Sequence, residues 1–479
     1  MNKLDSLTIC QPGGVFPDPH LWIEPRSQLS IRFAVFEGLV RYGSDLSIQP
    51  SLAENWTVSD DAKEWVFSIR DQVKYHDGTV ITAQDAAASI RNASREDVPG
   101  AYGTDALLYA YLGDADVNCI DESHLKITLS KPMADLPDLL AYIMIIPKDF
   151  IGKDPKTIPG TGPFKTAKIS EKTYKFTRFT DYWGEQPPVE KLVFIDERDA
   201  QKRVQLFKEG KVDVVTYLRK ADVGTLLDDP EAQLIHHEMP LSIPAFLNCF
   251  EGPFTDKRVR QAVNYGTDVD EIINKACDGD ANRLNGPLSK FHFGVDPDYP
   301  SYPYNPEKAR DLLKEAGYEN GLILTLFRPL IGPDESPVIA ACLRKQWEKI
   351  GITLEEKIQP DREQYALDVR GKNIHDLCIF DSSPVSTYRV LLEKLNSDAA
   401  GPWWQGYKST EFNALLKKAW ETVDGPLRAD LYRQALQIAA EDAAWLYLFS
   451  PNEWFVVRKT AAALIPDLCR RVDGVVVFN

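Results

Sequence analysis

The most constraining pattern in this chain is a β-hairpin followed by a capped helix, within residues 51–90. Hydrophobic and polar residues alternate on both sides of a turn at residues 59–62, and this alternation predicts two strands. Asp77-Gly78 then predicts a tight turn, and Thr82 predicts the N-terminal cap of a helix. The stretch therefore predicts mixed α and β structure. The alternating hydrophobic residues are Trp56, Val58, Trp65, Phe67 and Ile69.

The length of the chain predicts more than one domain, because 479 residues exceed a single ordinary core. Strand-like and helix-like segments alternate along it without an internal repeat, which predicts α/β or α+β layers. We expect the first long helix within residues 28–42, ending at Gly38. The longest apolar run, residues 139–146, has eight residues, whereas about 20 are needed to span a bilayer.

Charge and cysteine usage exclude some classes of protein and leave one question open. A net charge of −16 without a basic cluster excludes nucleic acid as the expected partner. The seven cysteines are scattered and form no CxxC pair, so we expect no disulfide framework and mostly small buried side chains. The first residues lack an apolar signal-peptide region, which fits a cytoplasmic protein or a mature domain behind an added Met1.

Motifs for common enzyme chemistry are absent from the sequence. No P-loop, HExxH, GxSxG or EF-hand spacing occurs. His236 and His237 are the only adjacent histidines, and neighbours on a strand point to opposite faces, so we expect no shared metal ion. The acidic pairs Asp60-Asp61 and Asp228-Asp229 lie in turn-like contexts, where solvated capping is expected.

Seven short blocks, in order along residues 15–465, carry a resemblance to a known family. Together they resemble the extracellular solute-binding proteins of family 5, which serve the dipeptide, oligopeptide and nickel ABC importers. The resemblance implies a binding protein without enzymatic activity or a cofactor of its own. Examples are VFEGLV at residues 35–40, GTGPF at 160–164, DYWG at 181–184 and the block at 254–265.

The resemblance also implies an architecture and a setting. The α/β fold would be a two-lobed periplasmic-binding-protein (flytrap) fold, monomeric, periplasmic or extracellular, with lipid or wall association open. Its partners would be a small-molecule solute and a membrane ABC permease. The hinge would lie near Pro244 and near Ser450-Pro451. Lobe I would comprise residues 1–43, 160–243 and 450–479, with a subdomain inserted at 44–159, and lobe II would comprise residues 244–449.

Family members bury their ligand between the lobes, which implies a set of candidate contacts. A loop near the N-terminus offers an aromatic wall and two charges, and other segments offer an amide, a guanidinium and stacking surfaces. Each candidate also has a purely structural alternative: a buried Trp in a surface loop, a core strand, an exposed Arg at a helix end, or aromatics that fix a loop. The candidates are Trp22, Glu24, Arg26, Tyr102, Phe246, Asn248, Arg370, Trp403 and Trp404.

The last candidate segment decides the expected ligand class. Peptide-binding members use an Asp there to hold the peptide ammonium group, and Ser383 occupies the corresponding position. Asp381 substitutes only if the loop shifts by two residues; Phe380, Ser382 and Tyr388 complete the segment. A desolvated ammonium without a carboxylate costs on the order of several kcal/mol. We therefore expect a non-peptide polar solute: an opine, a sugar conjugate, an oligosaccharide or an anionic chelate. A di- or oligopeptide is the alternative, and a cleft hydrolase the third.

Overall fold

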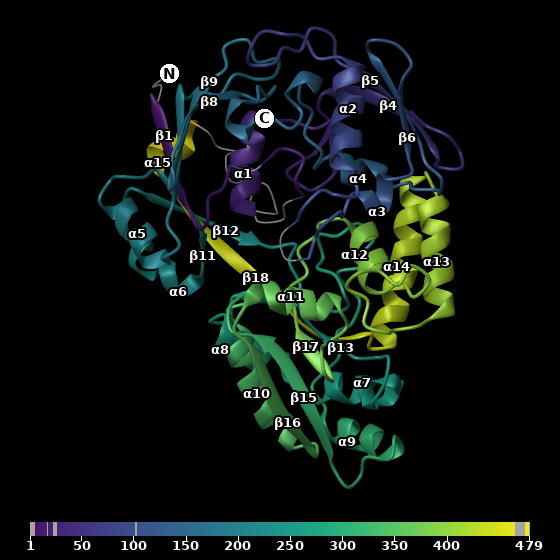
Figure 1. Ribbon diagram of the computed structural model, residues 1–479. Helices are drawn as coiled ribbons and strands as arrows, with labels where there is room; N and C mark the ends of the chain where they lie inside the picture. Colours follow the sequence, from purple (N-terminus) through teal and green to yellow (C-terminus); the bar gives the residue numbers. More distant parts are fainter. Residues whose placement is uncertain (1–4, 17, 23–25, 101–102, 465–474, 479) are drawn as a thin grey trace. The chain divides into compact units, whose positions relative to one another are not determined.

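The computed structural model describes residues 5–16, 18–22, 26–100, 103–464 and 475–478. It divides into two compact units, each with its own core, so the chain passes from one to the other twice (Figure 1). Unit 1 comprises Met1–His237 and Glu453–Asn479, and unit 2 comprises Glu238–Asn452. No helix among the described residues is long and apolar enough to cross a membrane.

The main sheet of unit 1 is built around strand β1 (Ser6–Gln11), which lies parallel to both of its neighbours. Leu7, Ile9 and Phe194 lie in its core and are fully buried. The other strands are β10 (Lys191–Asp196), β9 (Thr173–Arg178) and β8 (Phe164–Ile169) on one side, and β11 (Val214–Leu218) with the C-terminal part of β18 (Trp445–Arg458) on the other. Strand β12 (Ala232–Glu238) and helices α1 (Arg26–Val35), α5 (Ala200–Lys208), α6 (Lys220–Val223) and α15 (Lys459–Leu464) accompany them.

The predicted hairpin and capped helix are confirmed. Residue Thr82 begins helix α2 (Ala83–Ala93) with a capping box, in which the Asp85 carboxylate accepts from the Thr82 backbone N–H at 3.0 Å. Whether residues 44–159 form a separate subdomain stays a prediction. The hairpin strands belong to a four-stranded sheet of β4 (Ala53–Val58), β5 (Glu64–Ile69), β7 (His124–Thr128) and β6 (Asp116–Cys119). Nearby lie β2 (Val40–Tyr42), β3 (Ile48–Pro50), α3 (Tyr109–Leu112), α4 (Leu136–Leu140) and the short 3₁₀ helices Lys148–Phe150 and Pro155–Thr157.

The predicted end of the first long helix at Gly38 was wrong, and the GTGPF block explains why the helix ends earlier. Helix α1 stops at Val35, whose carbonyl accepts a hydrogen bond from Gly162 N–H at 2.9 Å. A Cβ atom on Gly160 would lie 1.8 Å from the Val35 carbonyl oxygen, so only glycine allows this approach. The chain then forms β2 instead of continuing the helix.

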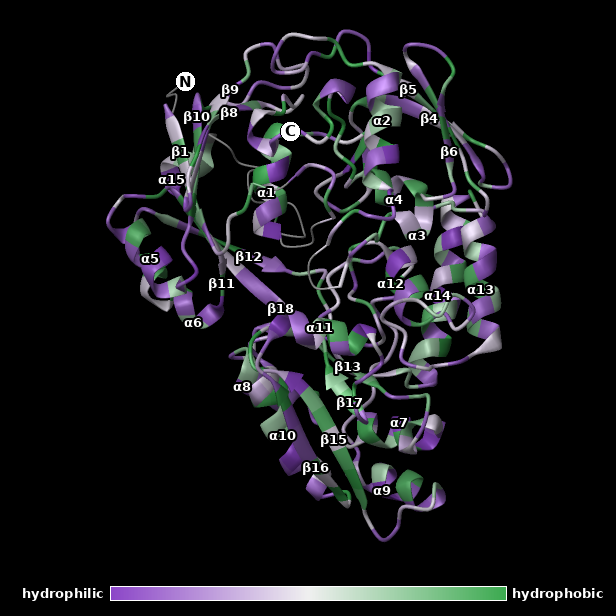
Figure 2. Ribbon diagram, viewed as in Figure 1, coloured by the Kyte–Doolittle hydropathy of each residue, from purple (hydrophilic) through white to green (hydrophobic). Residues whose placement is uncertain are grey.

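Unit 2 contains a second mixed sheet, in which β15 (Leu322–Pro329) is parallel to β16 (Ile352–Gln359) and β17 (Leu377–Ile379). Strand β13 (Ile243–Leu247) is antiparallel to β17 and to the N-terminal part of β18, which also pairs with β14 (Ala281–Arg283). Figure 2 shows hydrophobic residues along β15 and β17.

Helices cover this sheet, and α10 (Ser336–Glu348) packs against β15 and β16. Its fully buried Trp347 belongs to one core cluster, whereas Tyr365 and Phe380 belong to another. The other helices are α7 (Lys257–Tyr265), α8 (Val269–Ala276), α9 (Pro306–Glu315), α11 (Arg362–Arg370), α12 (Thr387–Lys394), α13 (Thr410–Glu421) and α14 (Gly425–Glu441). Short 3₁₀ helices occupy Gly224–Leu226 in unit 1 and Pro253–Thr255 in unit 2.

Candidate functional site

The segment that departs from the peptide-binding pattern, residues 380–383, follows strand β17 in unit 2. Hydrogen bonds from its backbone fix it to the start of β13 and to the residue before that strand. Phe380 N–H donates to the Pro244 carbonyl at 3.2 Å, and Ser382 exchanges two backbone hydrogen bonds with Ser242, at 2.8 and 3.1 Å. The side chains of segment 380–383 therefore project from a fixed backbone.

Arg362 engages the acidic residue of this segment. Its Nη2 lies 3.0 Å from Asp381 Oδ1, and its guanidinium lies 5.3 Å from the Phe380 ring centroid. The two charged side chains are 22% and 34% exposed, so solvent reaches both. Helix α11 begins at Arg362 because the Asp361 carboxylate accepts from Gln364 N–H at 3.0 Å. The Asp381 carboxylate is thus already paired with a cation.

A second cation approaches from helix α12. The buried Lys394 Nζ donates to Ser382 Oγ at 2.9 Å and lies 5.9 and 6.0 Å from the ring centroids of Phe246 and Phe380. In the same helix, buried Arg389 and Glu393 form an ion pair at 2.9 Å, and Glu393 directly precedes Lys394.

Aromatic rings pack around Phe380, and the two cations lie near the same rings. Phe246 lies 5.5 Å from Phe380 and Trp403 lies 5.2 Å from it, between ring centroids. Aromatic faces attract cations such as Arg362 and Lys394. We call this group the unit 2 cluster; it consists of Phe246, Arg362, Phe380, Asp381, Ser382, Lys394 and Trp403.

The remaining candidates of unit 2 have other contacts. Asn248 donates to the His375 carbonyl at 2.9 Å, Trp404 Nε1 donates to the Tyr407 carbonyl at 2.6 Å, and Tyr388 packs against Trp420 at 5.4 Å. The half-buried Ser383 directly follows the cluster. Arg370 ends helix α11, about 12 Å along the helix axis from Arg362.

In unit 1, Trp22 and Arg26 are held by protein contacts. The buried Trp22 ring packs against Tyr142, with centroids 5.1 Å apart. Arg26 donates twice to Glu453, at 2.8 and 2.7 Å. Burial alone would raise the pKa of the Glu453 carboxyl, but Arg26, with smaller contributions from Arg219 and His237, holds it below its usual value. Glu24 and Tyr102 lie outside the described residues.

Arg362 and Lys394 are the two site residues that the sequence did not indicate. The cap Asp361 and the buried Tyr365 and Val369 would have indicated helix α11. No short-range pattern joins Arg362 to Asp381, which is 19 positions away. Among the described residues, no group of three or more His, Cys, Asp or Glu side chains is placed to hold a metal ion.

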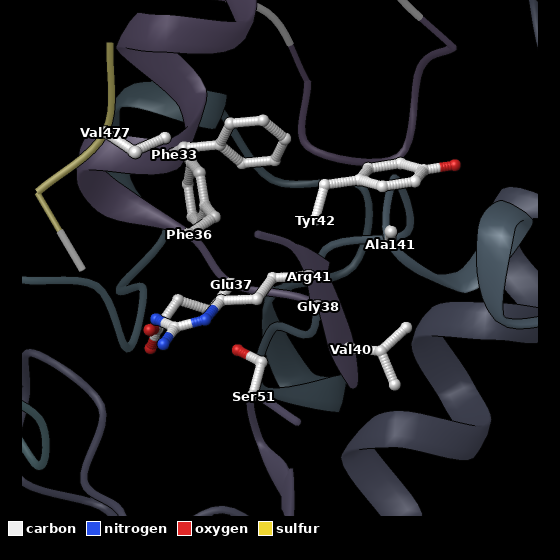
Figure 3. A pocket seen from close by; sticks show the side chains of 10 residues that line it. All are labelled: Phe33, Phe36, Glu37, Gly38, Val40, Arg41, Tyr42, Ser51, Ala141 and Val477. Carbon is white, nitrogen blue, oxygen red and sulfur yellow. The ribbon is translucent and has the colours of Figure 1, made fainter. Parts of the chain in front are cut away.

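Glu37 joins two of the family-like blocks beside a pocket in unit 1 (Figure 3). Its carboxylate accepts from Tyr182 Oη at 2.9 Å and from Trp183 Nε1 at 2.8 Å, which connects the VFEGLV and DYWG blocks. None of the candidate ligand residues lines this pocket. We therefore assign Glu37 to the framework. The lining residues are Phe33, Phe36, Glu37, Gly38, Val40, Arg41, Tyr42, Ser51, Ala141 and Val477.

A match to a family model identifies the family of this chain. The model of the bacterial extracellular solute-binding proteins, family 5 (middle region), matches residues 47–388, which is more than half of the chain. The chain belongs to this family. Family 5 proteins are binding components of ABC importers that deliver substrates to permeases, and they work in the periplasm or outside the cell.

Relatives and solved structures extend the match over nearly the whole chain. Heme-binding protein A of Haemophilus influenzae is 28% identical over 89% of this chain and 84% of its own length. The dipeptide-binding protein of Escherichia coli is 25% identical over 87% and 84%. HbpA2 from Haemophilus parasuis superimposes with a TM-score of 0.82 at 23% identity, covering 95% of this chain and 96% of its own. AgaA of Agrobacterium tumefaciens R10, in complex with agropinic acid, gives 0.76 at 27% identity, covering 95% and 93%. The predicted two-lobed family 5 fold is confirmed.

Proposed function

We propose that this family 5 protein captures a small, non-peptide, anionic solute and delivers it to an ABC permease. The observation that carries the proposal is the ion pair between Arg362 and Asp381. A peptide ammonium group needs a carboxylate partner when it leaves water. The Asp381 carboxylate is already paired with a cation, Arg362. Ser383 stands where peptide-binding members have their Asp. The unit 2 cluster thus favours a carboxylate over an ammonium group.

One relative supports this class of solute. AgaA, at 27% identity over 95% of this chain, was solved with agropinic acid, an organic acid. The dipeptide-binding protein of Escherichia coli, at 25% identity, supports the alternative that a di- or oligopeptide is bound. The two classes differ in the group that segment 380–383 must recognise.

A thermal-shift panel tests the proposal. The panel contains agropinic acid, Fe(III)-EDTA, heme, an acidic sugar and the dipeptide Ala-Ala, each at several concentrations. A solute at about 100 times its dissociation constant stabilises the protein by about 2.7 kcal/mol. We expect stabilisation by an anionic non-peptide and none by Ala-Ala. Stabilisation by Ala-Ala alone contradicts the solute class, and chemical consumption of a panel member contradicts a purely binding role.

Variants at the two ends of helix α11 give a matched pair. Arg362→Gln is expected to lower the affinity for the anionic solute at least about tenfold, because a charged hydrogen bond contributes about 1.5–3 kcal/mol. It also releases Asp381, so affinity for Ala-Ala should rise. Arg370→Gln removes the same charge from the other end of the helix. If Arg370 binds the solute instead, Arg370→Ala should lower the affinity for the solute at least about tenfold. Calorimetric titration measures both affinities.

Equal loss of affinity for both solutes in Arg362→Gln contradicts a selective role for this residue. Unchanged affinity in Arg370→Gln and Arg370→Ala removes Arg370 from the set of ligand contacts. Loss of affinity only in the Arg370 variants places the carboxylate contact at the C-terminal end of α11.

A further inference from the structure

Ser242 and Ser382 face each other across an isolated antiparallel bridge in unit 2. Ser242 N–H donates to the Ser382 carbonyl at 3.1 Å, and Ser382 N–H donates to the Ser242 carbonyl at 2.8 Å. Residues that exchange both backbone hydrogen bonds are directly opposite, so their side chains lie on the same face. Both residues are buried, at 0% and 1% exposure. Two hydroxyl groups therefore lie on one buried face.

These hydroxyls and Lys394 together offer hydrogen-bond donors. An ammonium group can only donate, so the Lys394–Ser382 hydrogen bond at 2.9 Å leaves the Ser382 hydroxyl proton to be donated elsewhere. The Ser242 hydroxyl oxygen is buried and has no hydrogen-bond partner among the described residues. The two hydroxyls are thus not bonded to each other. A buried hydroxyl without a partner destabilises the protein, and an acceptor from outside the chain removes that cost.

We propose that Ser242, Ser382 and Lys394 form a subsite for a carboxylate group of the transported solute. The inference rests on the proposed function and names three residues that recognise the anion. A carboxylate accepts several hydrogen bonds at once and is matched by the ammonium charge. An ammonium group of a ligand would instead bring a second positive charge beside Lys394.

The neighbourhood of the subsite fits a desolvated anion. Lys394 is 3% exposed and lies near the Phe246 and Phe380 rings, and the attraction between a cation and an anion is stronger in such a low-dielectric setting. Asp381 and Ser383, the neighbours of Ser382 in the chain, are partly exposed, so the segment lies close to solvent. Asp381, the negative charge in this segment, is paired with Arg362.

Bromide is a probe that distinguishes an anion from a bound water molecule, because only bromide scatters anomalously. Crystals of the full chain are soaked in sodium bromide and measured at the bromine edge. We expect an anomalous peak within hydrogen-bonding distance of Lys394 Nζ and both hydroxyls. Water density without an anomalous peak at this position overturns the subsite.

Serine variants test the same residues in solution. Ser242→Ala and Ser382→Ala should each lower the affinity for acetate about tenfold, as measured by a thermal-shift titration. Both variants should also remove the bromide peak. Ser336→Ala removes another fully buried hydroxyl of unit 2 and should leave both readouts unchanged. Urea unfolding confirms that each variant is folded. Unchanged acetate affinity in Ser242→Ala contradicts the proposal.

The subsite and the proposed function fail in different ways. If Ala-Ala binds but the bromide peak persists, the solute class is wrong and the anion subsite stands. If an anionic solute binds with equal affinity to the parent protein, Ser242→Ala and Ser382→Ala, the solute class stands and the subsite is wrong.

Discussion

Replacement of Arg26 by methionine is expected to lower the free energy of unfolding of unit 1 by about 3–5 kcal/mol at neutral pH, because it leaves a buried carboxylate without its main partner. Arg26 donates two hydrogen bonds to Glu453, whose side chain is 8% exposed. Urea unfolding measures the change. The control is Arg26→Met combined with Glu453→Gln, which removes both charges and should recover most of the loss.

The effect of Arg26→Met should depend on pH with a defined sign. The pKa of Glu453 is lowered in the folded protein, so the pair stabilises above the unfolded value of about 4.3 and is lost as the pH falls through the folded pKa. Without Arg26, burial should raise this pKa above its usual value. Stability of the variant should then fall as the pH rises from about 4 towards neutrality. A deficit that is equal at pH 4.5 and pH 7 would contradict this explanation.

Trp347→Ala is expected to destabilise unit 2 by about 3–5 kcal/mol, the usual loss when a large buried aromatic residue is truncated. Trp347 is 0% exposed and lies in the core between α10 and the sheet. Its Nε1 donates to Thr267 Oγ1 at 3.0 Å, and that hydroxyl donates to the Val263 carbonyl at 2.6 Å. The variant therefore creates a cavity and removes a buried hydrogen bond.

Trp347→Phe is the matched control for the cavity. It keeps most of the ring volume and loses the indole N–H, so a loss of about 1–3 kcal/mol is expected, close to the cost of an unsatisfied buried group. Hydrogen exchange should show faster opening in unit 2 and little change in unit 1. A uniform increase across both units would contradict two separate cores.

Local patterns predicted much of the fold because their causes lie within a few residues. The hairpin alternation and the Thr82 cap gave β4, β5 and α2. The first long helix, predicted to end at Gly38, was too long because its end depends on Gly162, more than a hundred positions away. A contact of that separation leaves no periodic signal in the sequence.

The candidate site was predictable only in part for the same reason. Phe380 and Asp381 were found because segment 380–383 departs from the family pattern. Arg362 and Lys394 reach that segment from the ends of two helices, and only the packing of α11 and α12 on the sheet determines which charges arrive there. The candidate site thus depends on tertiary contacts that no local sequence pattern reveals.

The joint at Glu37 has a practical consequence for engineering. One carboxylate fastens Tyr182 and Trp183 to the end of helix α1, and no predicted ligand residue takes part. A designer of fluorescent solute sensors can therefore leave this joint unchanged and diversify the proposed ligand residues Arg362, Lys394 and Ser242. Retargeting then becomes a search over a few side chains of unit 2, while the rest of the protein is kept constant.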